Sequence, residues 1–191
     1  MDKSKNIKHL LKGCIAKEPK AQKGLVNLYA GFIYTICHRY MRDEVFAEDM
    51  LQESLVKIFQ NLERFDESKG SFESWISTIA IRQCLSVIKK KRPTLITMDV
   101  LPESQQTSDT TSSLLLDQLD TDILVQFIVD LPEGYRTVFN LSAVDGHSHA
   151  EIAELLDITI VASRSRLNRA KNILKNRVLT LNKNESWANS I

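Results

Sequence analysis

Apolar residues recur at helical spacing along most of the chain, and no stretch sustains the apolar–polar alternation of a half-buried strand. Four long stretches follow the helical pattern: residues 20–42, 46–62, 71–92 and 114–131. Residues 1–19 are weakly patterned and allow one short helix before Pro19, after a loose tail. No internal repeat is present. The pattern therefore predicts an all-α protein.

Residues 131–175 form the most informative stretch, which reads as three helices separated by two tight breaks. Pro132 and Glu133 suit a first helical turn, where a missing N–H costs nothing and a carboxylate meets the positive end of the helix dipole. Asp145 and Gly146 are expected to end this first helix.

The second short helix of this stretch begins with a capping box, in which Ser148 bonds forward and Glu151 reaches back. A break at Asp157 and Ile158 follows, and Thr159 is placed to cap the third helix. The outer side of that third helix is basic: Arg164, Arg166, Arg169, Lys171 and Lys175. A short helix, a tight turn and a second helix with arginines in its opening turns indicate a helix-turn-helix, whose guanidinium groups reach guanine edges and phosphates.

Residues 93–113 contain Pro, Ser, Thr and Gln with little periodicity, and they read as a linker. The expected organisation is two helical domains joined by a flexible acidic linker. The bounds are 1–92 for the first domain, 93–117 for the linker, 118–178 for the second domain and 179–191 for a polar, frayed tail.

The formal net charge of +1 hides a basic–acidic–basic distribution. Residues 74–98 contain no acid, residues 93–135 contain no base, and the charges in residues 158–184 are all basic. The total charge alone argues against a polyanionic partner, whereas the two basic segments favour one.

Several classes of protein are disfavoured by what the sequence lacks. No stretch has the apolar length of a membrane span or a signal-peptide core, so a cytoplasmic location without membrane insertion is expected. Cys14, Cys37 and Cys84 form no CxxC pair and are expected to be buried thiols. No phosphate-binding glycine loop or hydrolase motif occurs, so we expect neither an enzyme nor a cofactor.

A metal site is the alternative interpretation of His147, His149 and Glu151. The capping box already explains Glu151, and two histidines without a third convergent ligand do not make a site. We therefore predict no metal.

Two helix faces carry candidate chemistry in the first domain. The polar face of the 46–62 helix has an ordinary interpretation as a solvated surface. The 71–92 helix places Phe72 on its buried side and aligns Trp75, Arg82, Ser86 and Lys89 on another strip. That strip is either a packing surface around a half-buried tryptophan or a stacking and phosphate-binding face for single-stranded nucleic acid. On this helix alone the packing interpretation is favoured.

Two blocks together resemble the extracytoplasmic-function branch of bacterial sigma factors. They are AEDMLQESLVKIFQNLERFDESKGSFESWISTIA at residues 47–80 and LPEGYRTVFNLSAVDGHSHAEIAELLDI with SRSRLNRAK at residues 131–171. With the flanking helices the resemblance covers residues 20–178. It implies a protein that binds core RNA polymerase, recognises the −35 element as duplex and the −10 element as single strand, and helps to melt the −10 segment.

The resemblance assigns roles to named residues. Contacts to the polymerase clamp helices fall on Asp49, Gln52, Glu53 and Phe59. Capture of the −10 strand, including a flipped base, falls on Phe65, Ser71, Phe72, Trp75, Arg82 and Lys89. Contacts to the −35 duplex fall on Arg164, Ser165, Arg166, Asn168, Arg169 and Lys171, of which Arg166 and Lys171 are expected to hold phosphates. The acidic linker resembles the connector that threads through the polymerase.

The second block departs from the family pattern where the third helix begins. Asp157 stands where the family usually has Gly, and Ile160 and Val161 replace a Glu-Gly or similar pair. Ser163 stands near a position that is usually hydrophobic. Two β-branched residues in a first turn add bulk where the backbone approaches phosphate, so the changes are expected to bear on −35 affinity more than on the fold.

The functional hypothesis is thus a sigma factor with core RNA polymerase, promoter DNA and a membrane-anchored anti-sigma factor as partners, the last implied by the family alone. Two alternatives stay open. One is a stand-alone helix-turn-helix regulator, which would leave the first domain without a role. The other is a protein-interaction module whose altered helix-turn-helix no longer reads DNA.

Overall fold

The computed structural model describes residues 3–90 and 121–188, and the described elements are all helical. The chain divides into two compact units, residues 1–88 and residues 89–191. The predicted linker, and the start of the helix predicted at 114–131, lie outside the described residues. The all-α prediction is confirmed.

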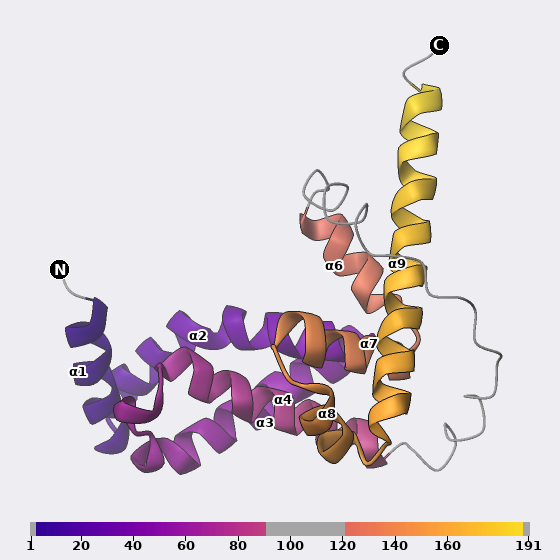
Figure 1. Ribbon diagram of the computed structural model, residues 1–191. Coiled ribbons are helices and arrows are strands. Elements are labelled where there is room, and N and C mark those ends of the chain that lie inside the picture. The colour runs from indigo at the N-terminus through magenta and orange to yellow at the C-terminus, as the bar shows by residue number, and fades with distance from the viewer. Residues whose placement is uncertain (1–2, 91–120, 189–191) are drawn as a thin grey trace. The chain divides into compact units, whose positions relative to one another are not determined.

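Within its described residues the first unit contains four α-helices and two short 3-10 turns. In order they are α1 (Lys3–Ile15), α2 (Pro19–Tyr40), α3 (Glu44–Asn61), η1 (Leu62–Arg64), η2 (Glu67–Lys69) and α4 (Phe72–Lys90). The helices α1 to α4 are labelled in Figure 1. Helix α2 packs against both α1 and α3. The core of this unit is apolar, with Leu25, Ile33, Tyr40, Ile58 and Ile76 among the fully buried side chains.

Local signals start the helices of this unit. Pro19 occupies the first turn of α2, and the Asp43 carboxylate caps α3 by accepting from Val45 N at 2.9 Å. Ser71 caps α4 as predicted, because its Oγ accepts from Ser74 N at 3.1 Å.

Helix α1 is more extensive and better anchored than the weak pattern of residues 1–19 suggested. Its Leu11 and Cys14 are buried. Gly13 permits close approach to α2, since a Cβ at this position would lie 2.7 Å from that of Ala21. The prediction for the thiols holds, since Cys14, Cys37 and Cys84 are buried and free.

The second unit contains α6 (Thr121–Val129), α7 (Glu133–Phe139), the π-turn η5 (Asn140–Val144), α8 (His149–Leu156) and α9 (Ile160–Ala188). One core cluster is formed by Ile128, Leu131, Ala170 and Leu174. Gly146, with φ +76°, directs the chain from η5 toward α8.

The end of α9 differs from prediction. A frayed tail was expected after residue 178, but α9 continues to Ala188. Residues 160–188 contain neither glycine nor proline, the two residues that destabilise a helix interior most.

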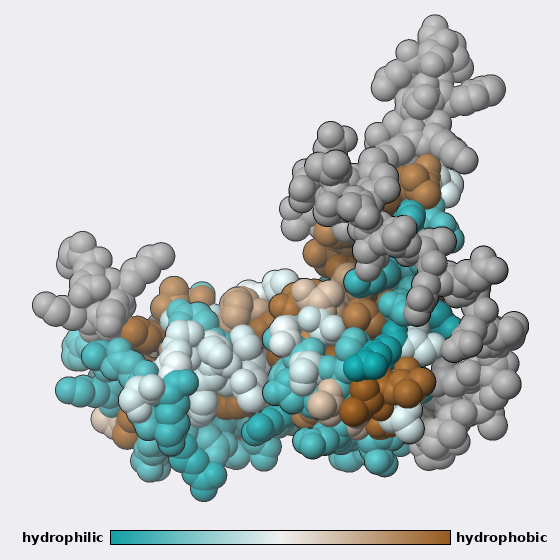
Figure 2. Space-filling view, in the orientation of Figure 1, coloured by the Kyte–Doolittle hydropathy of each residue, from teal (hydrophilic) through white to brown (hydrophobic). Residues whose placement is uncertain are grey.

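None of the helices in residues 3–90 and 121–188 combines the length and apolar character needed to cross a bilayer. Single apolar side chains do reach the surface, as the brown areas between teal polar residues in Figure 2 show. Leu28, Phe32, Val56 and Val161 are among the exposed ones.

Candidate polymerase and promoter interface

Helix α3 presents a polar strip opposite its buried side. Asp49, Gln52 and Glu53 are all exposed at i, i+3 and i+4, whereas Phe59 is half-buried. Val56 continues the strip at i+7 and is 52 % exposed. The sequence analysis missed Val56, although its spacing from Asp49 was visible. Two carboxylates, an amide and an apolar side chain on one face suit a helix-on-helix interface with a basic partner.

Side chains fix the loop between α3 and α4. The Asp66 Oδ1 atom accepts from the Ser68 hydroxyl at 2.7 Å and from Ser68 N at 3.0 Å. These hydrogen bonds hold the pKa of Asp66 below its ordinary value, with the Ser68 hydroxyl as the largest cause. Lys69 lies 3.5 Å from the same carboxylate. The loop is therefore shaped by its own polar groups.

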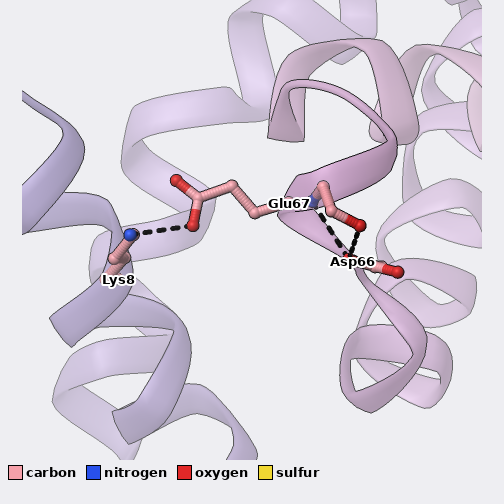
Figure 3. Close-up of polar contacts among 4 residues, drawn as sticks. Lys8, Asp66 and Glu67 are labelled. Atoms are coloured by element: carbon pink, nitrogen blue, oxygen red, sulfur yellow. Dashed lines mark hydrogen bonds and ion pairs between the residues drawn. The ribbon is translucent and has the colours of Figure 1, made fainter.

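Helix α1 contributes a further contact to this loop. Lys8 Nζ lies 2.8 Å from Glu67 Oε2, and the two side chains meet between α1 and η2 (Figure 3). Nothing in the local sequence pattern pairs these two residues, because they are far apart along the chain.

Four aromatic rings gather where the loop meets α4. Phe72 lies at the centre, with ring centroids 5.2 Å from Tyr29, 5.2 Å from Phe65 and 5.7 Å from Trp75. The Phe65 and Trp75 rings are 5.6 Å apart. Both are half-buried, so part of each ring is open to solvent.

Phe72, which the resemblance also assigns to −10 capture, lies inside this group of rings. Phe72 is only 4 % exposed and supports the rings on either side of it. The helical pattern had already placed it on the buried face, and packing between Tyr29, Phe65 and Trp75 explains why it stays there.

The other residues proposed for the −10 strand share one exposed side of α4. Ser71, Arg82 and Lys89 are exposed, and Trp75 is half-buried. Thr78 lies between Trp75 and Arg82 and is also exposed, which the sequence analysis did not single out. This side of α4 thus places an aromatic ring, a hydroxyl group and cationic groups in one row.

The helix-turn-helix forms as its local signals predicted. Ser148 Oγ accepts from Glu151 N at 3.3 Å, and Glu151 Oε2 accepts from Ser148 N at 2.8 Å. The bonds from Ser148 lower the pKa of Glu151, the one from its backbone N–H most. Thr159 Oγ1 caps α9 by accepting from Ala162 N at 3.0 Å. Asp157 adopts the left-handed conformation, with φ +53°.

His149 and Ser163 join the two helices of this motif. The Nδ1 atom of His149 lies 2.9 Å from Ser163 Oγ, and Ser163 is buried. The buried hydroxyl of Ser163, which stands near a position that is usually hydrophobic in the family, thus has a hydrogen-bond partner. Within the described residues no three potential metal ligands converge.

The polar side chains proposed to contact the −35 element differ in exposure along α9. Arg164, Asn168 and Lys171 are exposed opposite the core, whereas Ser165, Arg166 and Arg169 are half-buried. Arg169 Nη1 donates to the Tyr135 hydroxyl at 3.2 Å. A Cβ at Gly134 would lie 3.9 Å from Arg166 Nη1, which places Arg166 beside α7.

Two family models match the chain. The model for Sigma-70 region 2 matches residues 25–94, and the model for Sigma-70, region 4 matches residues 121–174. The two matches together cover more than half of the chain. The chain belongs to the sigma-70 family.

Relatives of this sigma factor place it in the extracytoplasmic-function branch. It is 29 % identical to the ECF RNA polymerase sigma factor SigW of Bacillus subtilis over 93 % of this chain and 97 % of the relative. It is 26 % identical to the ECF RNA polymerase sigma-E factor of Haemophilus influenzae, over 86 % of this chain and 90 % of the relative.

Two solved structures are also similar to this chain. One is the sigma factor RpoE in complex with the anti-sigma factor NepR from Bartonella quintana, 21 % identical with a TM-score of 0.48, covering 83 % of this chain and 96 % of that one. The other is CnrH in complex with the cytosolic domain of CnrY, 19 % identical with a TM-score of 0.47, covering 90 % and 96 %.

Family membership settles the general function. This sigma factor binds core RNA polymerase and directs promoter-specific initiation of transcription. A stand-alone helix-turn-helix regulator is not favoured, because the region 2 match accounts for the first unit. The exposed side of α3 and the aromatic rings around Phe72 fall within region 2, and the helix-turn-helix falls within region 4.

Proposed function

We propose that α9 of this sigma factor reads the −35 duplex through Arg164, Ser165, Asn168 and Arg169, while Arg166 and Lys171 hold phosphates. The observation that carries this proposal is the exposure of Arg164, Asn168 and Lys171 on the side of α9 opposite its buried residues. Arg169 donates to Tyr135 in the free protein, so reading a base would require it to exchange that partner.

The polymerase contact is proposed to lie on Asp49, Gln52, Glu53 and Phe59 of α3, with Val56 added. The exposure of two carboxylates beside an apolar side chain supports a surface that meets basic helices. Phe59 is half-buried, and its contribution would come from the exposed part of its ring.

The −10 strand is proposed to follow Phe65, Ser71, Trp75, Arg82 and Lys89, with Phe72 supporting the rings from below. Melting needs no cofactor in this scheme, because trapping unstacked bases on aromatic rings lowers the free energy of the open strand. The proposed division is residues 1–92 for core and −10 binding, 93–117 as a connector and 118–178 for −35 binding.

The remaining assignments follow from the family. We propose that the protein acts in the cytoplasm, where core RNA polymerase transcribes the genome. A membrane-anchored anti-sigma factor is the proposed inhibitor. Co-purification of an inhibitory protein with the intact chain tests this point, and full activity at all times without such a protein would argue against it.

In vitro transcription with the intact chain, core polymerase and a promoter library tests the functional assignments. Initiation from promoters that share two spaced elements is expected. Arg164→Ala should reduce the free energy of promoter binding by about 1–3 kcal/mol and relax base specificity at one −35 position. Lys171→Ala should weaken binding to all DNA sequences similarly. It should also lower the slope of the logarithm of the binding constant against the logarithm of salt concentration by about one.

A matched pair of variants isolates the polymerase contact. Asp49→Ala with Glu53→Ala should reduce core binding, whereas Glu63→Ala, an exposed acid on η1, should leave core binding unchanged. Failure of the intact chain both to co-purify with core and to initiate at any promoter would refute the proposed role.

A further inference from the structure

Tyr135 and Arg169 form a hydrogen bond between α7 and α9. Arg169 Nη1 donates to the Tyr135 hydroxyl oxygen at 3.2 Å, although the two residues are 34 positions apart in sequence. Helices α7 and α9 pack against each other (Figure 1). Because Arg169 is proposed to read a −35 base, this hydrogen bond engages a group that would also be needed for reading.

The Tyr135 ring is anchored in the second unit. It packs against the buried cluster formed by Ile128, Leu131, Ala170 and Leu174. Turning the ring away from this cluster would expose apolar surface to water, which is unfavourable. The hydroxyl oxygen therefore stays beside α9 as an acceptor and cannot follow the guanidinium if that group moves toward DNA.

The Arg169 side chain is better suited to a change of partner. It is half-buried, and arginine has a long side chain with many rotamers. Its guanidinium carries only donors, at Nε, Nη1 and Nη2. The Tyr135 hydroxyl oxygen and the O6 and N7 atoms of guanine are all acceptors. A base and Tyr135 therefore compete for the same guanidinium.

This competition has different consequences for different bases. Guanine presents two acceptors to a guanidinium in the major groove, whereas cytosine presents a donor there. When the base offers no acceptor, Arg169 can keep its hydrogen bond to Tyr135, so Nη1 is not left unpaired at the interface. An unpaired donor in a desolvated interface weakens binding. Tyr135 therefore reduces the difference in affinity between a matching base and the others.

We propose that Tyr135 is a positioning residue that acts through Arg169 and broadens the range of bases tolerated at one −35 position. This inference rests on the proposed reading of a base by Arg169. It adds a residue outside the recognition helix, and the role is opposite in sign to that of a direct DNA contact. Removal of the Tyr135 hydroxyl should sharpen recognition rather than weaken it.

The test measures binding of holoenzyme, formed from the intact chain and core polymerase, to promoter duplexes with each of the four base pairs at each −35 position. Tyr135→Phe keeps the ring in the core and removes the oxygen that accepts from Arg169. At one position its preference for the matching base pair should exceed that of the wild type by about fivefold, the size of one hydrogen bond to a partly exposed charged group. Preferences at the other −35 positions should stay as in the wild type.

A double-mutant cycle shows whether Tyr135 acts through Arg169. In the Arg169→Ala background, Tyr135→Phe should leave every −35 preference unchanged, because the donor for which base and hydroxyl compete is gone. Tyr34→Phe is the matched control. It removes a tyrosine hydroxyl from α2, in the first unit, and should leave the −35 preferences unaltered in both backgrounds.

The results distinguish failure of the inference from failure of the proposed function. An unchanged or reduced preference in Tyr135→Phe, a uniform loss of affinity for all sequences, or a gain that persists in the Arg169→Ala background would overturn the role of Tyr135. If Arg169→Ala alone still relaxed one −35 position, the reading of a base by Arg169 would stand. If Arg169→Ala changed no −35 preference, both the proposed reading by Arg169 and this inference would be wrong.

Discussion

Lys8 Nζ and Glu67 Oε2 lie 2.8 Å apart, which ties the first helix to the loop proposed to capture a −10 base (Figure 3). Lys8 precedes the residues that the region 2 model matches. The two side chains are 55 % and 58 % exposed, so the ion pair contributes at most about 1 kcal/mol to stability. Its effect should fall on the position of the loop rather than on the fold.

A charge exchange tests this link. Lys8→Glu places two carboxylates together and should reduce discrimination among −10 bases by about twofold to fivefold, in line with a surface ion pair. Lys8→Glu combined with Glu67→Lys should restore the wild-type pattern. Fork binding by holoenzyme at low and high salt provides the measurement. Equal behaviour of the single and double exchanges would separate the pair from −10 recognition.

Arg136 should be a major source of stability in the second unit. Its buried Nη1 donates to the carbonyl oxygens of Val129, the last residue of α6, and Leu131, at 2.8 and 2.9 Å. Arg136→Met keeps much of the volume but leaves two buried carbonyls without this donor, at a cost of roughly 2–4 kcal/mol. Urea unfolding of the intact chain should show an earlier transition for this unit.

Arg177 offers a matched comparison for that experiment. It donates to the carbonyls of Phe127 and Asp130 at 3.0 and 3.4 Å but is only half-buried. Arg177→Met should therefore cost less than Arg136→Met. A larger loss at position 177 would contradict this ranking.

Asp157→Gly should stabilise the helix-turn-helix by about 1 kcal/mol. Asp157 has φ +53°, a conformation that glycine adopts without the steric cost of a Cβ. Thermal unfolding of the second unit should shift upward. The opposite shift would mean that the Asp157 side chain stabilises the turn by more than its backbone strain costs.

Val161→Gly addresses the bulk at the start of α9. Val161 is 74 % exposed, so its removal takes little apolar contact from the core. If the side chain hinders the approach of the helix start to phosphate, −35 affinity should rise by several-fold despite the lower helix propensity of glycine. Holoenzyme binding to duplex −35 DNA measures the change, with Val144→Gly as the exposed-valine control. Unchanged −35 affinity would show that Val161 does not obstruct DNA.

Tyr29 should make stability depend on alkaline pH. The folded protein keeps this proton until about pH 12, whereas the unfolded chain loses it near 10. Between these values the folded state binds more protons, so its stability is fully present below pH 10 and falls as the pH rises through this window. The fall should be roughly 2–3 kcal/mol larger in the wild type than in Tyr29→Phe, because one pKa unit corresponds to about 1.4 kcal/mol. Parallel pH profiles of unfolding in the two proteins would argue against the shift.

Helix caps could be predicted from the sequence because the atoms that form them are close along the chain. The capping box of Ser148 and Glu151 and the cap at Ser71 each form within one helical turn. The exposed side of α9 follows from helical periodicity once Leu167 and Ala170 are assigned to the core. Helical periodicity likewise placed Phe72 on the buried side of α4, where it is 4 % exposed.

The pairs that shape the candidate sites have large sequence separations, and no local pattern encodes them. Tyr29 meets Glu73, Lys8 meets Glu67, and His149 meets Ser163 only when separate helices pack together. Helix α1 was weakly patterned because part of its support comes from contacts with α2.

The sequence by itself determined the helices, their caps and the family, since these depend on spacing and on neighbouring residues. The tertiary structure alone decided which side chains remain accessible and which partners fix them. Hydrophobic packing brings distant residues together and thereby sets burial, hydrogen bonding and pKa. The hydrogen bond of Glu73 and the burial of Phe72 depend on Tyr29 of α2 and Phe65 of the loop, which are distant from them in sequence.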